Sequence, residues 1–400
     1  MNCGSNKEAA RPVTTEFGKS EGTLRTSGTF FSRVESWRGL AALMVASAHA
    51  WQIPWRDGAG QLRSFYLPAP DVDGALLAAI TPYLQVLNNG GGAINAFFVM
   101  SGFVLALSLV RGPDDLGSSA TKFVIARIFR IYPAIIATIG IFLLVSWSTG
   151  LGPITSELYT LRHIVRNALL IDTSMNGVMW SLQVEMIAII PIFLAFALYR
   201  AWSIFPVVLL FIVLVAASFL GSTMRMLGPD LTALYAFIGG MLAFFGGRQA
   251  IGFLPPRWTA LTFAVAFVAM CLARLLLGFS SNWAAIVEAL LAAIVVAYLA
   301  FGALGTFGRL FDHSVVRFYG RISYSFYLLH PLTLWFAALA PEILGALVLS
   351  GIPTALVAFG VSAVTILAIT PLAWLIYRFV ERPSIAVGRA LTQRVRERTA

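Results

Sequence analysis

A histidine and an arginine share one strongly apolar stretch near the start of the chain. Arg38 and His49 are eleven positions apart, which on an α-helix is about 20° past three full turns and about 16 Å of rise. Both side chains are therefore expected on one helix face, with a fixed cation at one end and a titratable imidazole deeper along it. This arrangement suits a long substrate with an anionic head and a reactive tail. A plainer interpretation stays open, in which a helix-end arginine and a hydrogen-bonded histidine do no chemistry.

Further polar side chains interrupt other apolar runs. An ionisable group in hydrocarbon costs a few kcal/mol or more, so each one is a candidate for function. Counting along the expected helices places Glu185 about 10 Å below the outer surface and at the depth of His49, and His330 also reaches mid-membrane. Pro331 frees the carbonyl of Tyr327. The supporting polar residues, which single interhelical hydrogen bonds of about 1 kcal/mol would also explain, are Asn95, Ser101, Ser181 and Tyr327.

A second group of residues with chemical potential is basic. Arg127 and Arg130 stand three positions apart, so on a helix they point to the same side. With Arg38 they would bind phosphates through paired hydrogen bonds. Ordinary anchoring at the cytoplasmic surface is the alternative interpretation of these arginines.

The elements that must hold these residues are membrane-spanning helices. Of the 400 residues 58% are hydrophobic and only 12% are charged, whereas a soluble domain has about 25%. The apolar runs are continuous, which excludes the alternating pattern of a β-barrel. We predict an all-α, polytopic bundle of about ten transmembrane helices, at 36–54, 92–110, 122–147, 178–199, 203–221, 231–247, 258–277, 283–304, 318–340 and 353–380.

The basic residues predict the orientation of the bundle. With the N-terminus inside, 22 of the 28 Lys and Arg residues fall on the inner side, so both termini are expected in the cytoplasm and the protein in the inner or plasma membrane. This bias accounts for the net charge of +10 without a nucleic-acid partner. The outer loops at about 55–91 and 148–177 are then available to shape an acceptor site. The two cysteines, Cys3 and Cys271, indicate neither a disulfide framework nor a metal site.

Flanking segments complete the expected organisation. Residues 1–32 are rich in Ser, Thr and charge and lack the apolar core of a signal peptide, so we expect a disordered cytoplasmic tail. Residues 33–385 would form the transmembrane domain. Residues 386–400 would form a basic cytoplasmic tail.

Together these motifs resemble the acyltransferase 3 family of integral membrane O-acyltransferases, over about residues 33–385. Its members carry an Arg followed by His in the first helix, as at Arg38 and His49, and an Arg-x-x-Arg before a Pro, as at Arg127 and Arg130. The other matching segments are Phe97–Phe103, Ser181–Glu185, Ile322–His330 and Glu381–Pro383. One departure is Asn95, where the family often has Asp, so no acidic role is carried to that position.

The resemblance implies transfer of an acyl group, acetyl in the simplest case, from cytoplasmic acyl-CoA to a hydroxyl of a cell-surface polysaccharide or related glycan. Acyl-CoA would be a donor substrate and no cofactor would be bound permanently. Some relatives carry a fused extracytoplasmic hydrolase-like domain, for which the expected layout leaves no room, so any such partner would be a separate protein. Arg38, Arg127 and Arg130 would hold the nucleotide phosphates and the thioester would reach His49. His49 would act as general base or as an acyl relay, and Glu185 would orient it.

Several alternatives stay open at this stage. A transporter or flippase for a glycan or lipid-linked precursor would also carry polar groups at mid-membrane, although the chain has no repeat symmetry. A structural membrane protein would leave the shared depth of the polar groups unexplained. The sequence does not distinguish acetyl from succinyl or longer donors, nor one hydroxylated acceptor from another.

Overall fold

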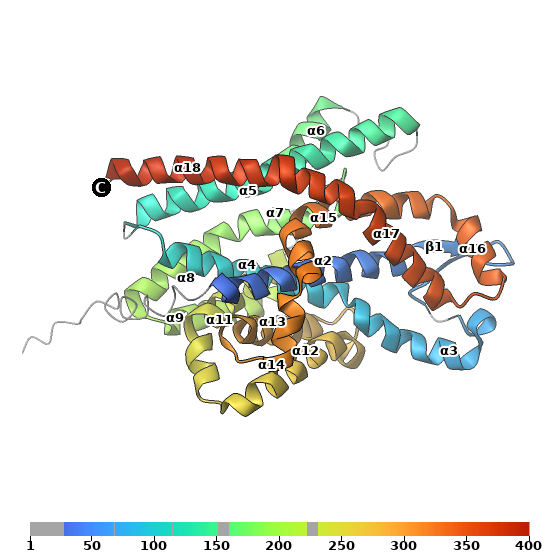
Figure 1. The fold of residues 1–400 in the computed structure, drawn as a ribbon, viewed down its shortest axis with the longest axis horizontal. Coiled ribbons are helices and arrows are strands. Elements are labelled where there is room, and N and C mark those ends of the chain that lie inside the picture. The colour runs from blue at the N-terminus through green and yellow to red at the C-terminus, as the bar shows by residue number, and fades with distance from the viewer. Residues whose placement is uncertain (1–27, 68, 114, 151–159, 222–230, 400) are drawn as a thin grey trace, which may run out of the picture.

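Long apolar runs in the sequence become long helices in the computed structural model (Figure 1), which describes residues 28–399 apart from 68, 114, 151–159 and 222–230. The first part of the chain forms α2 (Gly28–Trp51), β1 (Pro54–Arg56), β2 (Leu62–Ser64), α3 (Pro70–Gln85), η1 (Val86–Asn88), α4 (Gly90–Val110) and α5 (Leu116–Thr149). The middle part forms α6 (Leu161–Ala168), η3 (Gly177–Met179), α7 (Trp180–Ile187), α8 (Ile189–Trp202), α9 (Phe205–Ser218), η4 (Leu231–Ala233) and α11 (Leu234–Gly252). The last part forms α12 (Pro256–Leu277), α13 (Asn282–Phe301), α14 (Gly305–Asp312), α15 (Ser314–Ala338), α16 (Pro341–Leu349), α17 (Thr354–Ile376), the π-helix η5 (Tyr377–Glu381) and α18 (Arg382–Thr399).

The prediction of an all-α, polytopic membrane protein is confirmed. Within the described residues seven helical stretches are long and apolar enough to cross a membrane, and α15 with α16, bent by 69°, makes an eighth. The count is below the expected ten because two predicted spans do not qualify. The span at 36–54 lies in α2, whose apolar run is interrupted by Arg38 and His49, and the span at 203–221 is the 14-residue helix α9. Length and composition alone thus support seven or eight spans.

The surface of the bundle is apolar along its length, as a lipid-facing surface must be. On α9, Leu209 and Ile212 are more than half exposed, and on α12 so are Val265 and Val268. In water such a surface would mark an interface or an aggregation site. Here it fits helices whose outer faces are covered by lipid.

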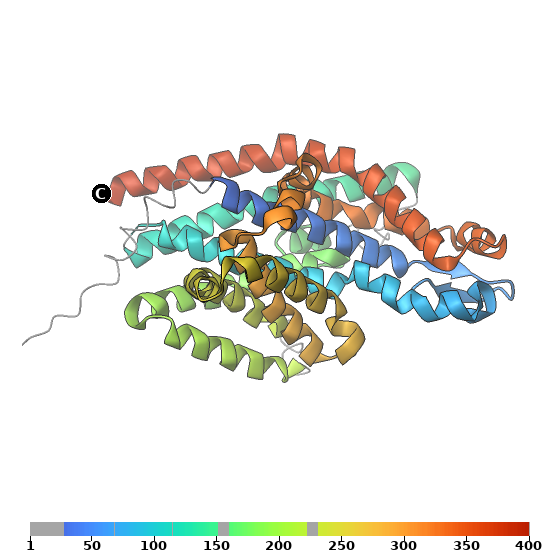
Figure 2. The same cartoon turned by 60° about the horizontal axis from the view of Figure 1, so that its bottom comes forward.

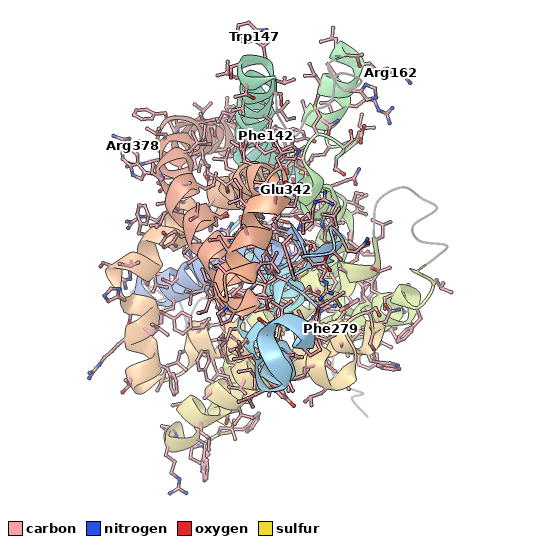
Figure 3. The ribbon with its side chains drawn as sticks, turned by 90° about the vertical axis from the view of Figure 1, so that its right-hand side faces the viewer. Phe142, Trp147, Arg162, Phe279, Glu342 and Arg378 are labelled. Atoms are coloured by element: carbon pink, nitrogen blue, oxygen red, sulfur yellow. The ribbon has the colours of Figure 1, made fainter. Side chains whose placement is uncertain are left out.

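The two ends of the bundle differ. One end, called the hairpin end, carries the antiparallel pair β1–β2 together with α3 and α16, at the right of Figures 1 and 2. The predicted outer loop at 55–91 is therefore largely ordered, as a hairpin and a helix. Figure 3 looks onto this end, with Glu342 of α16 near its centre and Phe279, from the loop between α12 and α13, below it.

The opposite end, called the arginine end, contains the start of α5 and the end of α18 (Figures 1 and 2). Here Arg33 of α2 makes a salt bridge of 2.7 Å with Asp312. Residues 386–399, which the sequence analysis assigned to a basic tail, continue α18, which packs along α5. Of the predicted N-terminal tail, residues 1–27 lie outside the described part of the chain and 28–32 begin α2.

Helix α2 lies at the centre and contributes to all three apolar cores. One core gathers around α4, α11 and α13, a second around α15, α5 and α17, and a third lies at the hairpin end. The helices α2 and α15 touch backbone to backbone, since a Cβ on Gly39 would lie 2.4 Å from the backbone nitrogen of Gly320. Glycine pairs of this kind let membrane helices approach closely. The crossing fixes Arg38, next to Gly39, against the start of α15.

Candidate active site

The site is built on four helices that meet between the first two cores. Helices α2, α4, α7 and α15 line a small cavity whose walls include Arg38, Ser101, Glu185 and Tyr327. Phe97 of α4 packs against both cores and its ring lies 5.6 Å from that of Tyr327. The cavity thus lies where the first and second cores meet.

Glu185 joins several polar side chains on the side of this site toward the arginine end. Its carboxylate accepts hydrogen bonds of 2.7 Å from Arg127 and of 2.7 Å from Ser101, and the side chains of Arg127 and Glu185 are only 6% and 15% exposed. Arg38 and Arg130 are near enough to act electrostatically on the same carboxylate. The three predicted phosphate-binding arginines therefore gather in one place, but one of them is already paired.

The expected contact between Glu185 and His49 is wrong. Glu185 binds Arg127 and Ser101 instead, because the helix that carries it does not begin at the surface of the bundle. Asn176, just before the 3₁₀ turn that leads into α7, donates a 2.8 Å hydrogen bond to the carbonyl of Leu328 and is buried. Counting the depth of Glu185 from an outer surface near residue 178 therefore placed it too close to His49.

The partner of His49 is a second histidine. Nδ1 of His49 lies 3.0 Å from Nε2 of His330, and His330 is fully buried. Nδ1 of His330 lies 2.6 Å from the carbonyl oxygen of Tyr327, which Pro331, lacking an N–H, leaves without its usual helical partner. The structure thus brings together the two imidazoles that the sequence predicted at mid-membrane depth on separate helices.

Ser181 and Tyr327 form a hydrogen-bonded pair between the group around Glu185 and the pair of histidines. Their hydroxyl oxygens are 2.8 Å apart, and both lie within 3.1 Å of the carbonyl oxygen of Val178. Since Tyr327 also supplies the carbonyl that holds His330, this residue is linked to both α7 and the histidine pair.

A larger cavity of about 220 Å³ adjoins His49 on the side of the hairpin end. Its walls carry Gln52, Tyr66, Gln85, Asn88 and Arg274. Burial raises the pKa of the Tyr66 phenol, an effect that Arg274 partly offsets, so the phenol stays neutral and able to donate. Amides, a phenol and one guanidinium make this a polar cavity suited to a hydroxylated group.

The two cavities adjoin along one face of α4. Ile94 lines both of them, with Arg38 in the wall of the first and His49 in the wall of the second. Along α2 these two residues span about 16 Å. The geometry therefore places a guanidinium in one cavity and an imidazole in the other, on one helix and about 16 Å apart along its axis.

A comparison with family models decides the class of protein. The model described as an acyltransferase domain matches residues 31–378. The chain belongs to the acyltransferase 3 family. No curated protein and no solved structure matches it.

Family membership makes this acyltransferase 3 protein a multi-pass membrane O-acyltransferase, which has an acyl donor and an acceptor as substrates. The resemblance stated from the sequence is thereby confirmed. The predicted site residues other than Asn95 and Arg130 line one of the two cavities or hydrogen-bond to a residue that does, and Arg130 acts electrostatically on Glu185.

Asn95 belongs to a different network. Its side-chain amide donates to Glu288 at 2.9 Å, and Asn89 and Arg274 bind the same carboxylate at 2.8 Å and 3.0 Å. Glu288 is fully buried, so the network satisfies a carboxylate inside the bundle. Arg274 and Glu288 thus form an ion pair, and Asn95 helps to hold α4 against α13.

Glu381 is a site residue to which the sequence analysis gave no role. It is 3% exposed, accepts a 2.8 Å hydrogen bond from Ser325 of α15 and acts electrostatically on Arg38. It ends the π-helical turn η5, and π-turns inside helices are frequent at functional sites. The Glu-x-Pro motif was the available signal, because Pro383 cannot donate to the carbonyl of Phe379 and thus loosens the turn.

Proposed function

We propose that this protein transfers an acyl group, acetyl in the simplest case, from cytoplasmic acyl-CoA to a hydroxyl of an extracytoplasmic glycan, with His49 as the reacting imidazole. One observation carries the proposal. His49 lines a polar cavity at the hairpin end, while Arg38 on the same helix lines an adjoining cavity among basic residues. That geometry fits a long donor whose anionic head and thioester lie far apart.

The orientation follows from charge. The excess of Lys and Arg on one side favours a cytoplasmic arginine end and cytoplasmic termini. Acyl-CoA is made in the cytoplasm, so its phosphates would meet Arg38 and Arg130 first. Arg127, being paired with Glu185, would contribute mainly by holding that carboxylate in place.

The reaction needs one proton transfer in each direction. Nε2 of His49 takes the proton of the acceptor hydroxyl as its oxygen attacks the thioester carbonyl, and the C–S bond then breaks. The proton returns from Nε2 to the departing CoA thiolate, so the products are the ester and free CoA. A positioned base of this kind contributes about 10²–10⁴-fold to the rate.

A relay through His49 is the second form of the same proposal. Nε2 of His49 would attack the thioester carbonyl and the C–S bond would break, so CoA would leave as a thiolate and an acyl-imidazolium would remain. The acceptor oxygen would then attack this carbonyl, the C–N bond would break to restore the imidazole, and the hydroxyl proton would go to the CoA thiolate. The two forms differ in one measurable product, because only the relay acylates His49. Protein incubated with acetyl-CoA and no acceptor, then denatured quickly in the cold near neutral pH, would show the acetyl mass on His49.

The acceptor would enter from the hairpin end. The cavity beside His49 is lined by neutral amides and the Tyr66 phenol, with Arg274 as its charged group. At about 220 Å³ it is smaller than the ~300–1,000 Å³ of sites for drug-sized ligands. It therefore suits one hydroxylated ring, such as a sugar residue of a longer glycan that continues outside.

Replacing His49 tests the function directly. Membranes with His49→Ala should transfer radiolabel from acetyl-CoA to envelope polysaccharide, extracted from cells that lack the protein, at least about a hundredfold more slowly. His163→Ala is the matched control, because His163 is a partly exposed histidine on α6 that lines neither cavity. Wild-type transfer by inserted His49→Ala protein would overturn the proposal. Mass analysis of surface glycans with and without the protein would then name the acyl group.

A further inference from the structure

The histidine pair rests on a proline. In a regular helix the carbonyl of Tyr327 would accept a hydrogen bond from the backbone N–H of residue 331. Residue 331 is proline, which has no N–H, and the side chain of His330 approaches the freed oxygen to 2.6 Å through Nδ1. The helix therefore supplies an acceptor to one of its own side chains.

This contact determines which nitrogen of each ring carries a proton. A carbonyl oxygen only accepts, so Nδ1 of His330 must be the donor, and in the neutral ring Nε2 is then an acceptor. The 3.0 Å contact between Nε2 of His330 and Nδ1 of His49 consequently needs a proton on Nδ1 of His49. The remaining nitrogen of His49, Nε2, is left with a free lone pair.

The geometry of the rings supports this chain of donors and acceptors. The ring planes lie within 21° of each other and the centroids are 5.2 Å apart, while the two nitrogens are only 3.0 Å apart. The nitrogens therefore face each other edge to edge instead of lying one ring above the other. The rings of Phe326 and Tyr327 also lie near His330, with centroids at 6.4 Å and 5.6 Å.

We propose that His330, held by the Tyr327 carbonyl that Pro331 frees, is a positioning residue that presents Nε2 of His49 as the unprotonated, reactive nitrogen. The proposal rests on the function proposed above for His49. In other histidine-based sites a carboxylate holds the second ring nitrogen and fixes the tautomer. Here a neutral imidazole and a backbone carbonyl do the same.

Two substitutions at residue 330 test the proposal. His330→Leu removes the acceptor for Nδ1 of His49, and we expect kcat to fall at least about a hundredfold, the contribution of a positioned base. In His330→Gln the side-chain oxygen takes the place of Nε2 as acceptor, so kcat should return to within about fivefold of wild type. KM for acetyl-CoA should stay within about twofold in both, because Arg38 and Arg130 remain untouched.

A merely structural His330 would behave differently. If the residue only fills space, leucine would be tolerated at least as well as glutamine, and that order of kcat would overturn the proposal. Wild-type kcat in His330→Leu, when His49→Ala is inactive, would overturn this inference alone. Activity in His49→Ala would overturn the function on which it rests.

Pro331→Ala gives a second test that needs no change to either histidine. The new N–H competes for the Tyr327 oxygen, which has two lone pairs, so we expect a partial loss of kcat, about three- to tenfold. The melting temperature should not fall, since alanine restores a helical hydrogen bond. Pro371→Ala in α17 is the control, because this proline also lies inside a helix but lines neither cavity. Unchanged kcat in Pro331→Ala would contradict the proposed chain.

Discussion

Arg127 and Glu185 form a buried ion pair, and breaking it from one side should be far more damaging than removing it whole. Arg127→Gln leaves Glu185 with Ser101 as its remaining direct partner. Removing one member of a buried pair costs about 3–5 kcal/mol, because the other charge stays buried without compensation. Total stabilities of domains are about 5–15 kcal/mol, so Arg127→Gln should sharply reduce the yield of folded protein.

The double variant Arg127→Gln with Glu185→Gln should recover much of this loss. Two neutral amides remain within hydrogen-bonding reach, and replacing both charges of a buried pair is often nearly neutral. We expect a coupling free energy of about 2–3 kcal/mol between the two sites, at the upper end of values for residues in contact. Thermal unfolding in detergent, followed by size-exclusion chromatography, measures it for the wild type, both single variants and the double variant.

The same four proteins separate two roles for Arg127. If Arg127 binds the phosphates of the donor directly, the double variant should lose a charge-assisted hydrogen bond of about 1.5–3 kcal/mol, which is roughly a 10- to 150-fold rise in KM for acetyl-CoA. If Arg127 mainly anchors Glu185, the folded double variant should show a much smaller rise, and Arg38→Gln should show the large one. Additive losses of stability in the double variant would refute the reasoning from the buried pair.

Two further predictions concern other parts of the bundle. Gly320→Val should destabilise the protein by at least about 1–3 kcal/mol and lower activity, because a Cβ at this position would lie 2.6 Å from the backbone oxygen of Glu35. Thermal unfolding measures this loss, and a melting temperature equal to that of wild type would contradict the close crossing of α2 and α15. Asp312 accepts hydrogen bonds from Arg33 and Arg317, and the bond from Arg33 chiefly holds the pKa of its carboxyl below the usual range. The contribution of Asp312 to the free energy of unfolding is at most about 1 kcal/mol for each of these part-exposed pairs. It should be present above pH ~4 and be lost as the pH falls below that. The melting-temperature difference between wild type and Asp312→Asn should therefore shrink at low pH, and an unchanged difference would count against this prediction.

The sequence predicts the class of fold well because hydrocarbon imposes a simple rule on it. Every span must satisfy its own backbone and face lipid with apolar side chains, so continuous apolar runs become helices. The rule fails for α2, whose Arg38 and His49 line cavities inside the bundle. It also says nothing of the β1–β2 hairpin and α3, which lie in a loop region whose folding depends on tertiary contacts at the hairpin end.

Distances within the site were predictable only where the helices are regular. Arg38 and His49 share α2, which runs without interruption from Gly28 to Trp51, so their separation could be read from the sequence. Glu185 stands on α7, which follows the buried residue Asn176 and a 3₁₀ turn. An irregular entrance of this kind leaves no periodic signal, and the predicted depth of Glu185 failed for that reason.

The arrangement keeps ionised groups out of direct contact with His49. The ionised groups around the donor cavity, among them Arg38, Arg127 and Glu185, gather toward the arginine end, where they offset one another. An ionised carboxylate beside His49 would add several kcal/mol of desolvation at mid-membrane. Freeing the Tyr327 carbonyl costs much less, because the Nδ1–H of His330 replaces the backbone N–H that Pro331 lacks as its hydrogen-bond donor. In the proposed mechanism the site thus gains a fixed tautomer for His49 without an ionised carboxylate in contact with it, which explains why His49 is held by His330, and through it by a backbone oxygen, and not by Glu185.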